Sequence, residues 1–362
     1  MYKSGLRELE LHYSPRPKWY FKRAEKILTA VVESYINLYG AKRFLRNLAS
    51  PVFFDALSVT SFLDELKGGA TTIMATILKN TLKPEIGLAI VGGKRVEGYR
   101  VPVELDKIAE VFTFSQEILD YLKYASRMVA KVDNVAIQDG FPLYFHMMII
   151  SEDGEWTVIQ QGIRSLEGLV RRYHWSSTKV KSFVEEPHTG IISTQREKVV
   201  IDMTSIKSRE SREVCVELVT CDFKRLRKTY EAHSNGGQIT LTNLEDVEGE
   251  VKLEVPRIKW AIIQSLSQVQ PKNFEELLAW RGIGLQTLRF LVIASIELYR
   301  VYPSFKDPAV SFEEAYKSME NLNDKCIYEV MDAVKESSLE IFLKKVCCNR
   351  LDDLLSMLEA NS

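Results

Sequence analysis

The sequence predicts an α+β fold: a mostly helical chain with a central antiparallel β-hairpin or small sheet and a C-terminal helix-hairpin-helix. Three observations predict this class. Apolar residues recur at helical spacing through most of the N-terminal part of the chain. Two segments rich in aromatic and β-branched residues, 141–151 and 155–163, flank the turn signal Glu152-Asp153-Gly154. Residues 274–299 read as two helices joined by a glycine-containing turn.

The N-terminal part is expected to hold several helices and one strand. Residues 1–20 contain two prolines and are expected to be irregular. Helical spacing covers 21–48 and breaks at Gly40, a residue suited to the position after a helix C-terminus. The short apolar run 86–94, closed by two glycines, predicts a buried strand. Further helices are expected from Pro51 to Gly68-Gly69, over 70–82 before Pro84, and over 103–131.

The rest of the chain is expected to be largely helical beyond the two central strands. Residues 165–232, including a charged stretch at 205–231, are predicted as mostly helix, and short helices are predicted after Pro256. The Asn235-Gly236-Gly237 break and the acidic residues 245–250 suit a linker. The predicted units are a core over 1–235 and a helical C-terminal domain over 236–362 with its helix-hairpin-helix at about 273–300.

Composition places the chain among ordinary globular proteins. Of 362 residues, 46% are hydrophobic and 27% charged, and the formal net charge of -1 gives no global attraction to nucleic acid. The five cysteines form no C-x-x-C pair, which favours reduced thiols over a disulfide framework. The sequence shows neither a secretory signal nor a run of about twenty apolar residues. We therefore expect a cytoplasmic protein without membrane contact, associated with the nucleoid if it binds DNA.

The clearest motif is FEELLAWRGIGLQTLRFLVIASIELY, residues 274–299. A helix with Leu277 and Leu278 is followed by Arg281-Gly282-Ile283-Gly284 and then by a second apolar helix. Glycines let the chain approach a phosphate closely, and the second helix presents free N–H groups where its dipole favours an anion. Ile283 is expected to fill the space between the helices. The alternative is a plain αα-hairpin with glycine at its turn.

This hairpin predicts contact with the DNA backbone, which positions a duplex without reading its sequence. The basic segment 164–181 has aromatic residues between its cations and also suits phosphate contact with base stacking. Its alternative is a solvated helix face. The predicted DNA-binding residues are Arg171, Arg172, Arg281, Gly282, Gly284, Gln286, Thr287 and Arg289.

Residues 127–190 hold the densest set of side chains able to carry chemistry. The predicted catalytic candidates are Lys131, Asp133, Asp139, His146, Glu155, His174, Glu186 and His188. Carboxylates are the ligands that Mg²⁺ or Mn²⁺ prefers, so Asp133, Asp139 and Glu155 are the predicted metal ligands, with Lys131 or His146 near the attacking water. A zinc-like site would instead use the three histidines and Glu186. On a simple hairpin, Asp139 and Glu155 lie at opposite ends, whereas His146 and Gln161 face each other.

Two other chemistries stay open. Asp307 lies about twenty residues beyond the second glycine of the hairpin, the place of the catalytic Asp in helix-hairpin-helix glycosylases. Such a group would stabilise an oxocarbenium-like sugar while a flipped base leaves. A turn residue that caps a helix before proline is the alternative. Gly68-Gly69-Ala70-Thr71-Thr72 would seat a phosphate in a nucleotide- or RNA-modifying enzyme, or simply cap a helix.

Several stretches resemble the prokaryotic family catalogued as domain of unknown function 763. The longest are Lys131–Gly140, Glu152–Gly162, Arg171–Trp175 and Ser182–Ile191, and shorter ones are Gly5-Leu6 to His12, Gly69–Thr72 and Val91–Lys94. The resemblance implies that these blocks share one core with the C-terminal hairpin. Residues Val310–Glu320 depart from the Gly- and His-rich stretch of that family.

The preferred interpretation is a DNA-binding protein of the DNA-repair type, a metal-dependent nuclease that hydrolyses phosphodiester bonds in duplex, damaged or branched DNA. A DNA glycosylase that needs no metal is the first alternative. A non-enzymatic accessory DNA-binding protein is the second. The sequence makes no prediction of oligomeric state.

Overall fold

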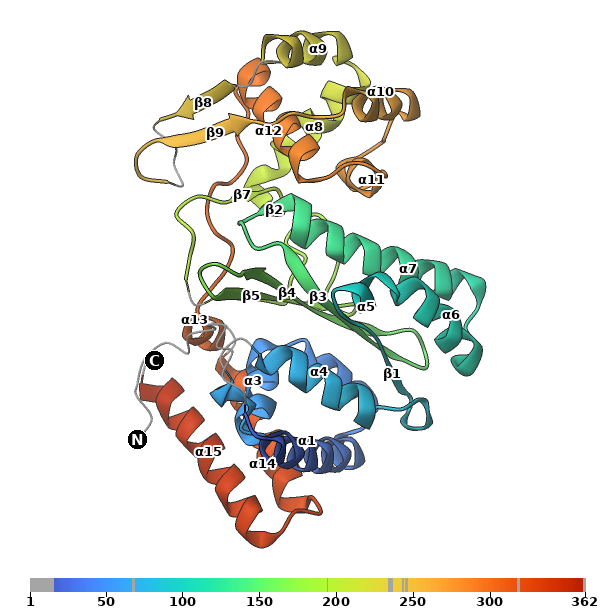
Figure 1. Cartoon of the computed structure of the whole chain (residues 1–362), viewed down its shortest axis with the longest axis vertical. Coiled ribbons are helices and arrows are strands. Elements are labelled where there is room, and N and C mark those ends of the chain that lie inside the picture. Colours follow the sequence, from blue (N-terminus) through green and yellow to red (C-terminus); the bar gives the residue numbers. More distant parts are fainter. Residues whose placement is uncertain are drawn as a thin grey trace.

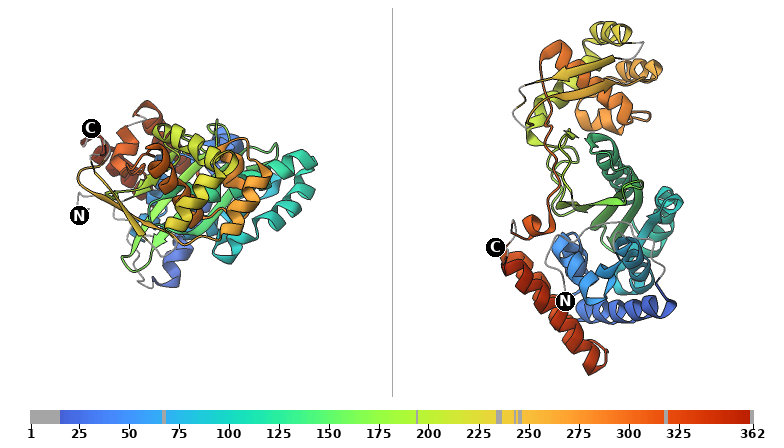
Figure 2. Two further views of the ribbon diagram at one scale, coloured as in Figure 1. Left: turned by 90° about the horizontal axis from the view of Figure 1, so that it is seen from above. Right: turned by 60° about the vertical axis from the view of Figure 1, so that its left-hand side comes forward.

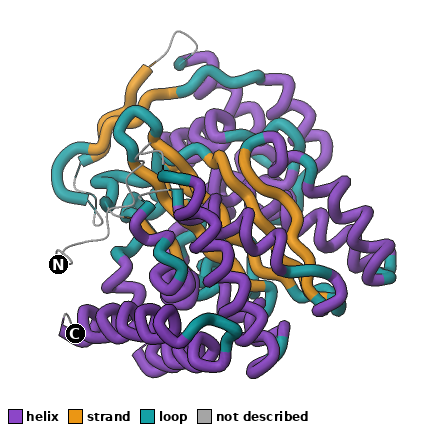
Figure 3. Tube along the Cα trace, turned by 60° about the horizontal axis from the view of Figure 1, so that its bottom comes forward, coloured by secondary structure: helices purple, strands orange, loops and turns teal. Residues whose placement is uncertain are grey.

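The computed structural model describes residues 16–66, 69–193, 195–233, 237–242, 244, 247–317 and 320–360. Within these ranges the chain forms a five-stranded antiparallel sheet with helices on both faces (Figures 1 and 3). The strand order is β1-β3-β4-β5-β6. The strands are β1 (Leu88–Lys94), β3 (Leu143–Ser151), β4 (Trp156–Arg164), β5 (Leu169–Ser176) and β6 (Gly190–Ser193).

Both faces of this sheet are buried. Successive side chains of a strand point to opposite faces, so Met147 and Ile149 enter one apolar cluster while Met148 and Ile150 enter the other. The first cluster belongs to helices from both ends of the chain. These are α1 (Lys18–Tyr39), α2 (Ala41–Leu48), α3 (Pro51–Thr60), α4 (Ala70–Thr81), α14 (Glu320–Glu336) and α15 (Ile341–Ala360).

The second face carries a different group of helices, which continues into the upper part of the molecule in Figure 1. They are α6 (Val101–Phe112), α7 (Gln116–Lys131), the π-helical turn Val132–Ala136, α8 (Arg209–Thr220), α9 (Phe223–Ala232), α10 (Trp260–Val269), α11 (Phe274–Ala279) and α12 (Leu285–Tyr299). Two small sheets lie here, β2 (Ile137–Gln138) with β7 (Ile201–Asp202) and β8 (Gly237–Leu241) with β9 (Val251–Val255). The short helices α5 (Val96–Tyr99) and α13 (Phe312–Lys317) connect elements.

The predicted α+β class is confirmed, and so are its local signals in the first half of the chain. Gly40 ends α1 with a φ of 86°, a backbone conformation that glycine adopts without strain. Pro51 starts α3, where its missing N–H costs nothing. Strands β3 and β4 form the expected hairpin across the Asp153-Gly154 turn. The stretch Gly5 to His12, residue Gly68 and the break at 235–236 lie outside the described residues.

Residues 165–232 correct the sequence-based expectation, because the predicted helix over 165–181 is wrong. Strand β5 runs through Arg171–Trp175, and β6 follows it at the sheet edge. The segment has strand-like β-branched and aromatic residues, but its cations suggested a solvated helix. Two of those cations, Arg171 and Arg172, are buried against carboxylates from distant parts of the chain. The helical expectation for 205–231 is met by α8 and α9.

The two ends of the chain meet in one layer (Figure 2). Glu329 of α14 is buried and accepts hydrogen bonds from the Tyr35 hydroxyl of α1 at 2.5 Å and from Asn47 of α2 at 3.1 Å. Arg350 of α15 pairs with Asp64 at 2.7 Å. Segments from both sides of residue 235 thus contribute to both apolar clusters, and the predicted domain boundary stays a prediction. No described helix is long and apolar enough to cross a membrane.

Candidate functional site

The α11–α12 hairpin has the helix–turn–helix geometry expected from its sequence. Helix α11 ends at Ala279, residues 280–284 form the turn, and α12 begins at Leu285. Ile283 is 2% exposed and packs in the apolar cluster, as predicted for the residue between the helices. Gly282 adopts a φ of 101° at the exposed corner of the turn, where a side chain would be strained and would meet Ile262.

The N-terminus of α12 is uncapped. Gly284 occupies the N-cap position with no side chain to accept a hydrogen bond. The amides of Leu285, Gln286 and Thr287 meet no acceptor within the part of the chain that the structure describes. A Cβ atom at Gly284 would face open space. Three backbone donors and the positive end of the helix dipole are therefore available to an anion.

Lys131, at the end of α7, binds the inner side of the turn formed by residues 280–284. Its ammonium donates to the carbonyl oxygen of Trp280 at 3.0 Å and to that of Ile283. Burial, with a smaller effect of the neighbouring Arg127, lowers the pKa of Lys131 to about 8. A positive charge thus lies under the turn whose amides point outward. The sequence singled out Lys131 but predicted a role beside an attacking water.

Gln138 ties the first turn of α12 to the centre of the molecule. Its amide nitrogen donates to the Leu285 carbonyl at 3.3 Å, and its amide oxygen accepts from Nε of Arg289 at 2.8 Å. Arg289 is half-buried, and burial lowers its pKa. Thr287 is buried, so its side chain does not face a ligand at the surface. Of the predicted contacts on the hairpin, Arg281, Gly282 and Gln286 are exposed and Gly284 is half-buried.

A second group of predicted residues forms a buried polar cluster between the π-helical turn and the sheet. Asp133 is fully buried and accepts from Gln160, from the indole N–H of Trp175 at 2.9 Å and from Nε2 of His188 at 2.6 Å. The His188 ring packs on Trp175 with their centroids 4.3 Å apart. These contacts hold one loop and two strands around a single carboxylate.

His146 extends this cluster toward α7. Its Nδ1 lies 2.8 Å from Oε1 of Gln160 and its Nε2 lies 2.9 Å from the Ser126 hydroxyl. Strand pairing places His146 opposite Gln160, whereas the sequence suggested Gln161, one residue further along. Burial lowers the pKa of His146, which keeps the ring neutral at pH 7. Both of its nitrogens are used within the fold.

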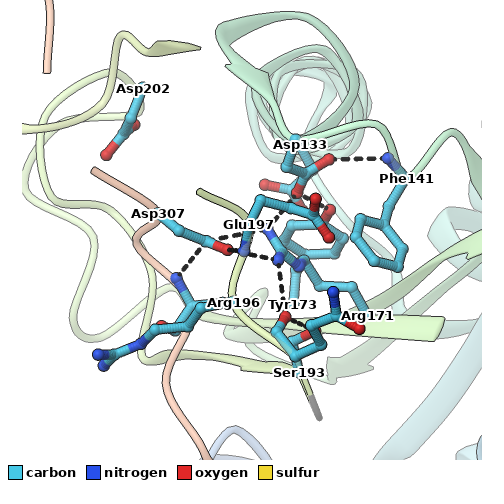
Figure 4. Close-up of polar contacts among 12 residues, drawn as sticks. Asp133, Phe141, Arg171, Tyr173, Ser193, Arg196, Glu197, Asp202 and Asp307 are labelled. Atoms are coloured by element: carbon cyan, nitrogen blue, oxygen red, sulfur yellow. Dashed lines mark hydrogen bonds and ion pairs between the residues drawn. The ribbon is translucent and has the colours of Figure 1, made fainter. Parts of the chain in front are cut away.

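Arg171 joins two predicted active-site carboxylates in the interior, and Figure 4 shows it beside one of them, Asp307. Its guanidinium pairs with Asp139 at 2.9 Å and with Asp307 at 2.7 Å. Asp307 also accepts from the amides of Ala309 at 2.9 Å and Glu197 at 2.6 Å. Both terminal nitrogens of Arg171 donate to Asp307, so with the two amides four donors fill its two oxygens and fasten the segment after α12 to β5. This arrangement matches the turn interpretation of Asp307 better than a glycosylase role.

The predicted Mg²⁺ or Mn²⁺ ligands do not converge. Asp133 and Asp139 are saturated by donors of the chain, and Glu155 pairs with Arg46 at the surface, 2.8 Å from its Nε. Glu155 is also far from Asp133. It lies five positions before Gln160, which contacts Asp133, and five positions along a strand span about 16 Å. Among the described residues, no three His, Cys, Asp or Glu side chains gather in a way that would hold a metal ion.

The zinc-like set is separated by the sheet itself. His146 faces α7, whereas His174 of β5 faces the opposite layer, where it packs on Phe54 and accepts from Arg172 at 2.7 Å. Burial lowers the pKa of His174 well below its usual value, and Arg172 adds to that shift. Glu186 lies in an exposed loop, where it accepts from the Ile206 amide.

The predicted DNA contacts on β5 are likewise buried. Arg171 is 0% exposed, and Arg172 is 2% exposed with its guanidinium paired to Asp55 at 2.9 Å. Neither cation is available to a phosphate at the surface.

The sequence-based prediction did not include Arg127 among the hairpin contacts, although Arg127 is exposed beside Lys131. Its helical spacing of four residues from Lys131 is the signal that could have identified it.

Comparison with known proteins gave one match. The family model described as "Protein of unknown function (DUF763)" matches residues 5–317, which include the sheet, the polar cluster and the α11–α12 hairpin. No curated protein and no solved structure matches the chain.

Proposed function

The chain belongs to the DUF763 family of proteins of unknown function, and we propose that it is a DNA-binding protein whose α11–α12 hairpin holds the phosphate backbone of a duplex. The uncapped N-terminus of α12 carries this proposal. Three amides without a protein acceptor, at a turn where Gly284 leaves the approach open, suit one phosphate group. Backbone amides bind a phosphate without reading the bases.

Charge around the turn supports the same ligand. Arg281 is exposed within it, Arg127 is exposed beside it, and the Lys131 ammonium lies beneath it. The formal net charge of the whole chain is only -1, so attraction to DNA depends on this local group of cations. A site that neutralises few phosphates binds with a shallow salt dependence, about 0.9 in log–log slope for each phosphate.

The geometry favours binding over the enzymatic interpretations. A metal-dependent nuclease needs its carboxylates together around an open site, and Asp133, Asp139 and Glu155 are each engaged elsewhere. A glycosylase needs a carboxylate that faces the sugar, and Asp307 is held by Arg171 in the interior. We therefore propose the accessory DNA-binding role that the sequence left as an alternative.

Substitution at Gly284 tests the proposal without strain on the fold. The residue has a φ of -119°, which any amino acid adopts, and open space around its missing Cβ. Gly284→Asp supplies a favoured N-cap carboxylate that takes up the free amides and repels a phosphate. We expect duplex affinity, measured by fluorescence anisotropy, to fall at least about tenfold while the melting temperature stays equal or rises.

Gly284→Asn is the matched control for charge. Its side chain caps the same amides but carries no charge, so we expect a smaller loss of affinity than with Gly284→Asp. A Gly284→Asp variant that is folded and binds duplex DNA as tightly as the original chain would refute the hairpin as the DNA contact.

A further inference from the structure

The end of β1 and the segment that follows it present three exposed cations. Lys94, Arg95 and Arg100 are all exposed, and none forms an ion pair with any residue that the structure describes. They bracket α5 within seven consecutive residues, Lys94 to Arg100. We call this segment the α5 loop. Its seven residues carry three cations against one carboxylate, Glu97, and this positive excess makes it a local site of attraction for an anion.

The two carboxylates nearest these cations, Glu97 and Glu104, have partners of their own. Glu97 accepts the backbone amide of Lys94 at 3.2 Å. Glu104 accepts from the amide of Gly92 at 2.9 Å and from Lys79 at 3.1 Å. Both acidic groups therefore serve the backbone at the end of β1. The Lys94 ammonium lies 5.8 Å from the centroid of the Tyr144 ring, whereas Arg95 and Arg100 form no ion pair with any described residue and are left to an external partner.

The backbone of the α5 loop is held in a costly conformation. Arg95 has a φ of 51° and a ψ of -110°, a combination that residues with a side chain rarely adopt. Its amide donates to the Tyr144 carbonyl at 2.7 Å, and its carbonyl accepts from Gly98 at 3.1 Å. Such strain costs about 1–3 kcal/mol and tends to occur where a binding geometry requires it.

Tyr99 projects from the middle of this charged segment. It is 87% exposed, more than any other tyrosine among the large exposed apolar residues, and its hydroxyl has no partner within the described chain. A tyrosine on the surface normally lays its ring against neighbouring side chains. A free aromatic ring between unpaired cations matches the surfaces on which proteins stack unpaired bases beside their phosphates.

We propose that the α5 loop is a second nucleic-acid contact that stacks Tyr99 on an unpaired base while Arg95 and Arg100 bind the adjoining phosphates. This inference rests on the proposed function of the hairpin and names its ligand more closely: duplex DNA with a single-stranded arm. The hairpin amides hold the duplex part, and the α5 loop takes the unpaired part.

The placement of the two contacts suits one DNA molecule. Helix α7 contacts α11 on one side and α6 on the other, and α5 contacts α6 and β1 (Figure 1). Packed helices lie 8–10 Å apart and three such contacts link the hairpin to the α5 loop, so the two are separated by at most roughly 30 Å. That is less than the length of one duplex turn, about 34 Å.

Tyr99→Ala tests the stacking contact on two DNA probes, a blunt duplex and the same duplex with a ten-nucleotide single-stranded tail. We expect the variant to lose about tenfold in affinity for the tailed probe and to bind the blunt duplex as before. Tyr99→Phe keeps the ring and should bind both probes like the original chain. Tyr121→Ala removes a tyrosine of α7 that is 46% exposed, and it is the matched control with no expected effect.

The charged part of the contact is tested by salt. Arg95→Ala with Arg100→Ala should lower the salt slope for the tailed probe by about 1.4, the value for two phosphates of a single strand. Equal affinity of the Tyr99→Ala variant for the tailed probe would overturn the inference. Binding of polyglutamate as tight as that of the tailed probe would also overturn it, because the loop would then attract any polyanion, including an acidic protein.

The two proposals fail separately. If Gly284→Asp leaves blunt-duplex affinity intact while Tyr99→Ala weakens the tailed probe, the hairpin assignment is wrong and the α5 loop contact stands. If Gly284→Asp abolishes duplex binding while Tyr99→Ala changes nothing, the hairpin stands alone.

Discussion

Lys131 shows how one side chain serves both the fold and the proposed ligand. Its ammonium binds two carbonyls of the turn, so the turn keeps its shape and its amides face outward. Its positive charge also lies under the place where a phosphate would bind. Because burial lowers the pKa of Lys131 to about 8, this charge is present below pH 8 and lost above it.

The affinity for duplex DNA is therefore predicted to fall as pH rises through about 8. A bound phosphate favours the charged amine and raises its pKa; a rise of one unit corresponds to a tenfold change in affinity. We expect affinity to fall about fivefold between pH 6.5 and pH 9 in anisotropy titrations at constant salt.

Two variants separate this effect from other titrating groups. Lys131→Met keeps the length of the side chain without charge, so it should bind more weakly at pH 6.5 and show no dependence on pH. Lys123→Met removes a cation of the same helix that pairs with Asp106, and it should keep the pH dependence of the original chain. A Lys131→Met variant with the original pH profile would contradict the role given to Lys131.

At the residue scale, the sequence identified several side chains with important contacts, but it did not predict what those contacts are. Lys131, Asp133 and His188 stood out because charged residues cluster around apolar strands. Their partners are far away in the chain: Lys131 meets a carbonyl 149 positions later, and Asp133 meets His188 55 positions later. No local pattern encodes such contacts. The hairpin glycines were easier to interpret, because their signal lies within a few residues.

At the scale of elements, β5 shows why a buried charged strand escapes prediction. Arg171 and Arg172 are neighbours in sequence and so point to opposite faces of the sheet. Each meets its own carboxylates, Asp139 and Asp307 for Arg171 and Asp55 for Arg172. Local sequence shows the cations but not these partners. The hairpin of β3 and β4 was predicted correctly because its apolar strands and Asp-Gly turn are adjacent in the chain.

The ion pairs of Arg171 are predicted to be essential for the stability of β5. Arg171→Met leaves the carboxylates of Asp139 and Asp307 buried without their cation, and breaking a buried pair in this way costs about 3–5 kcal/mol. We expect the free energy of unfolding in urea to fall by that amount. Adding Asp139→Asn and Asp307→Asn removes the uncompensated charges and should restore part of the loss.

A loss below about 1 kcal/mol for Arg171→Met would contradict this structural role, since it would mean that the carboxylates are not buried charges. Arg225→Met is the matched control, because Arg225 is exposed and pairs with Asp222 at the surface. Exposed pairs contribute about 0–1 kcal/mol.

At the scale of the molecule, the sheet separates two helical layers that differ in the segments they contain. One layer joins the first and last helices of the chain through Glu329 and Arg350. The other leads through α7 to the α11–α12 hairpin, and it carries the α5 loop at its other side. The sequence indicated the helices of both layers. It did not indicate that α14 and α15 return to α1 and α3, because that packing depends on contacts nearly 300 positions apart.

Amide hydrogen exchange at the first turn of α12 tests the central claim most directly. If the amides of Leu285, Gln286 and Thr287 bind a phosphate, their exchange should slow on addition of saturating duplex DNA, since these donors have no acceptor within the described protein. The first amides of α15, from Ile341 to Leu343, belong to the opposite helical layer, so they are an internal reference and should be unaffected. Unchanged exchange at 285–287 with DNA bound would contradict the account, because the duplex would then be held by another surface.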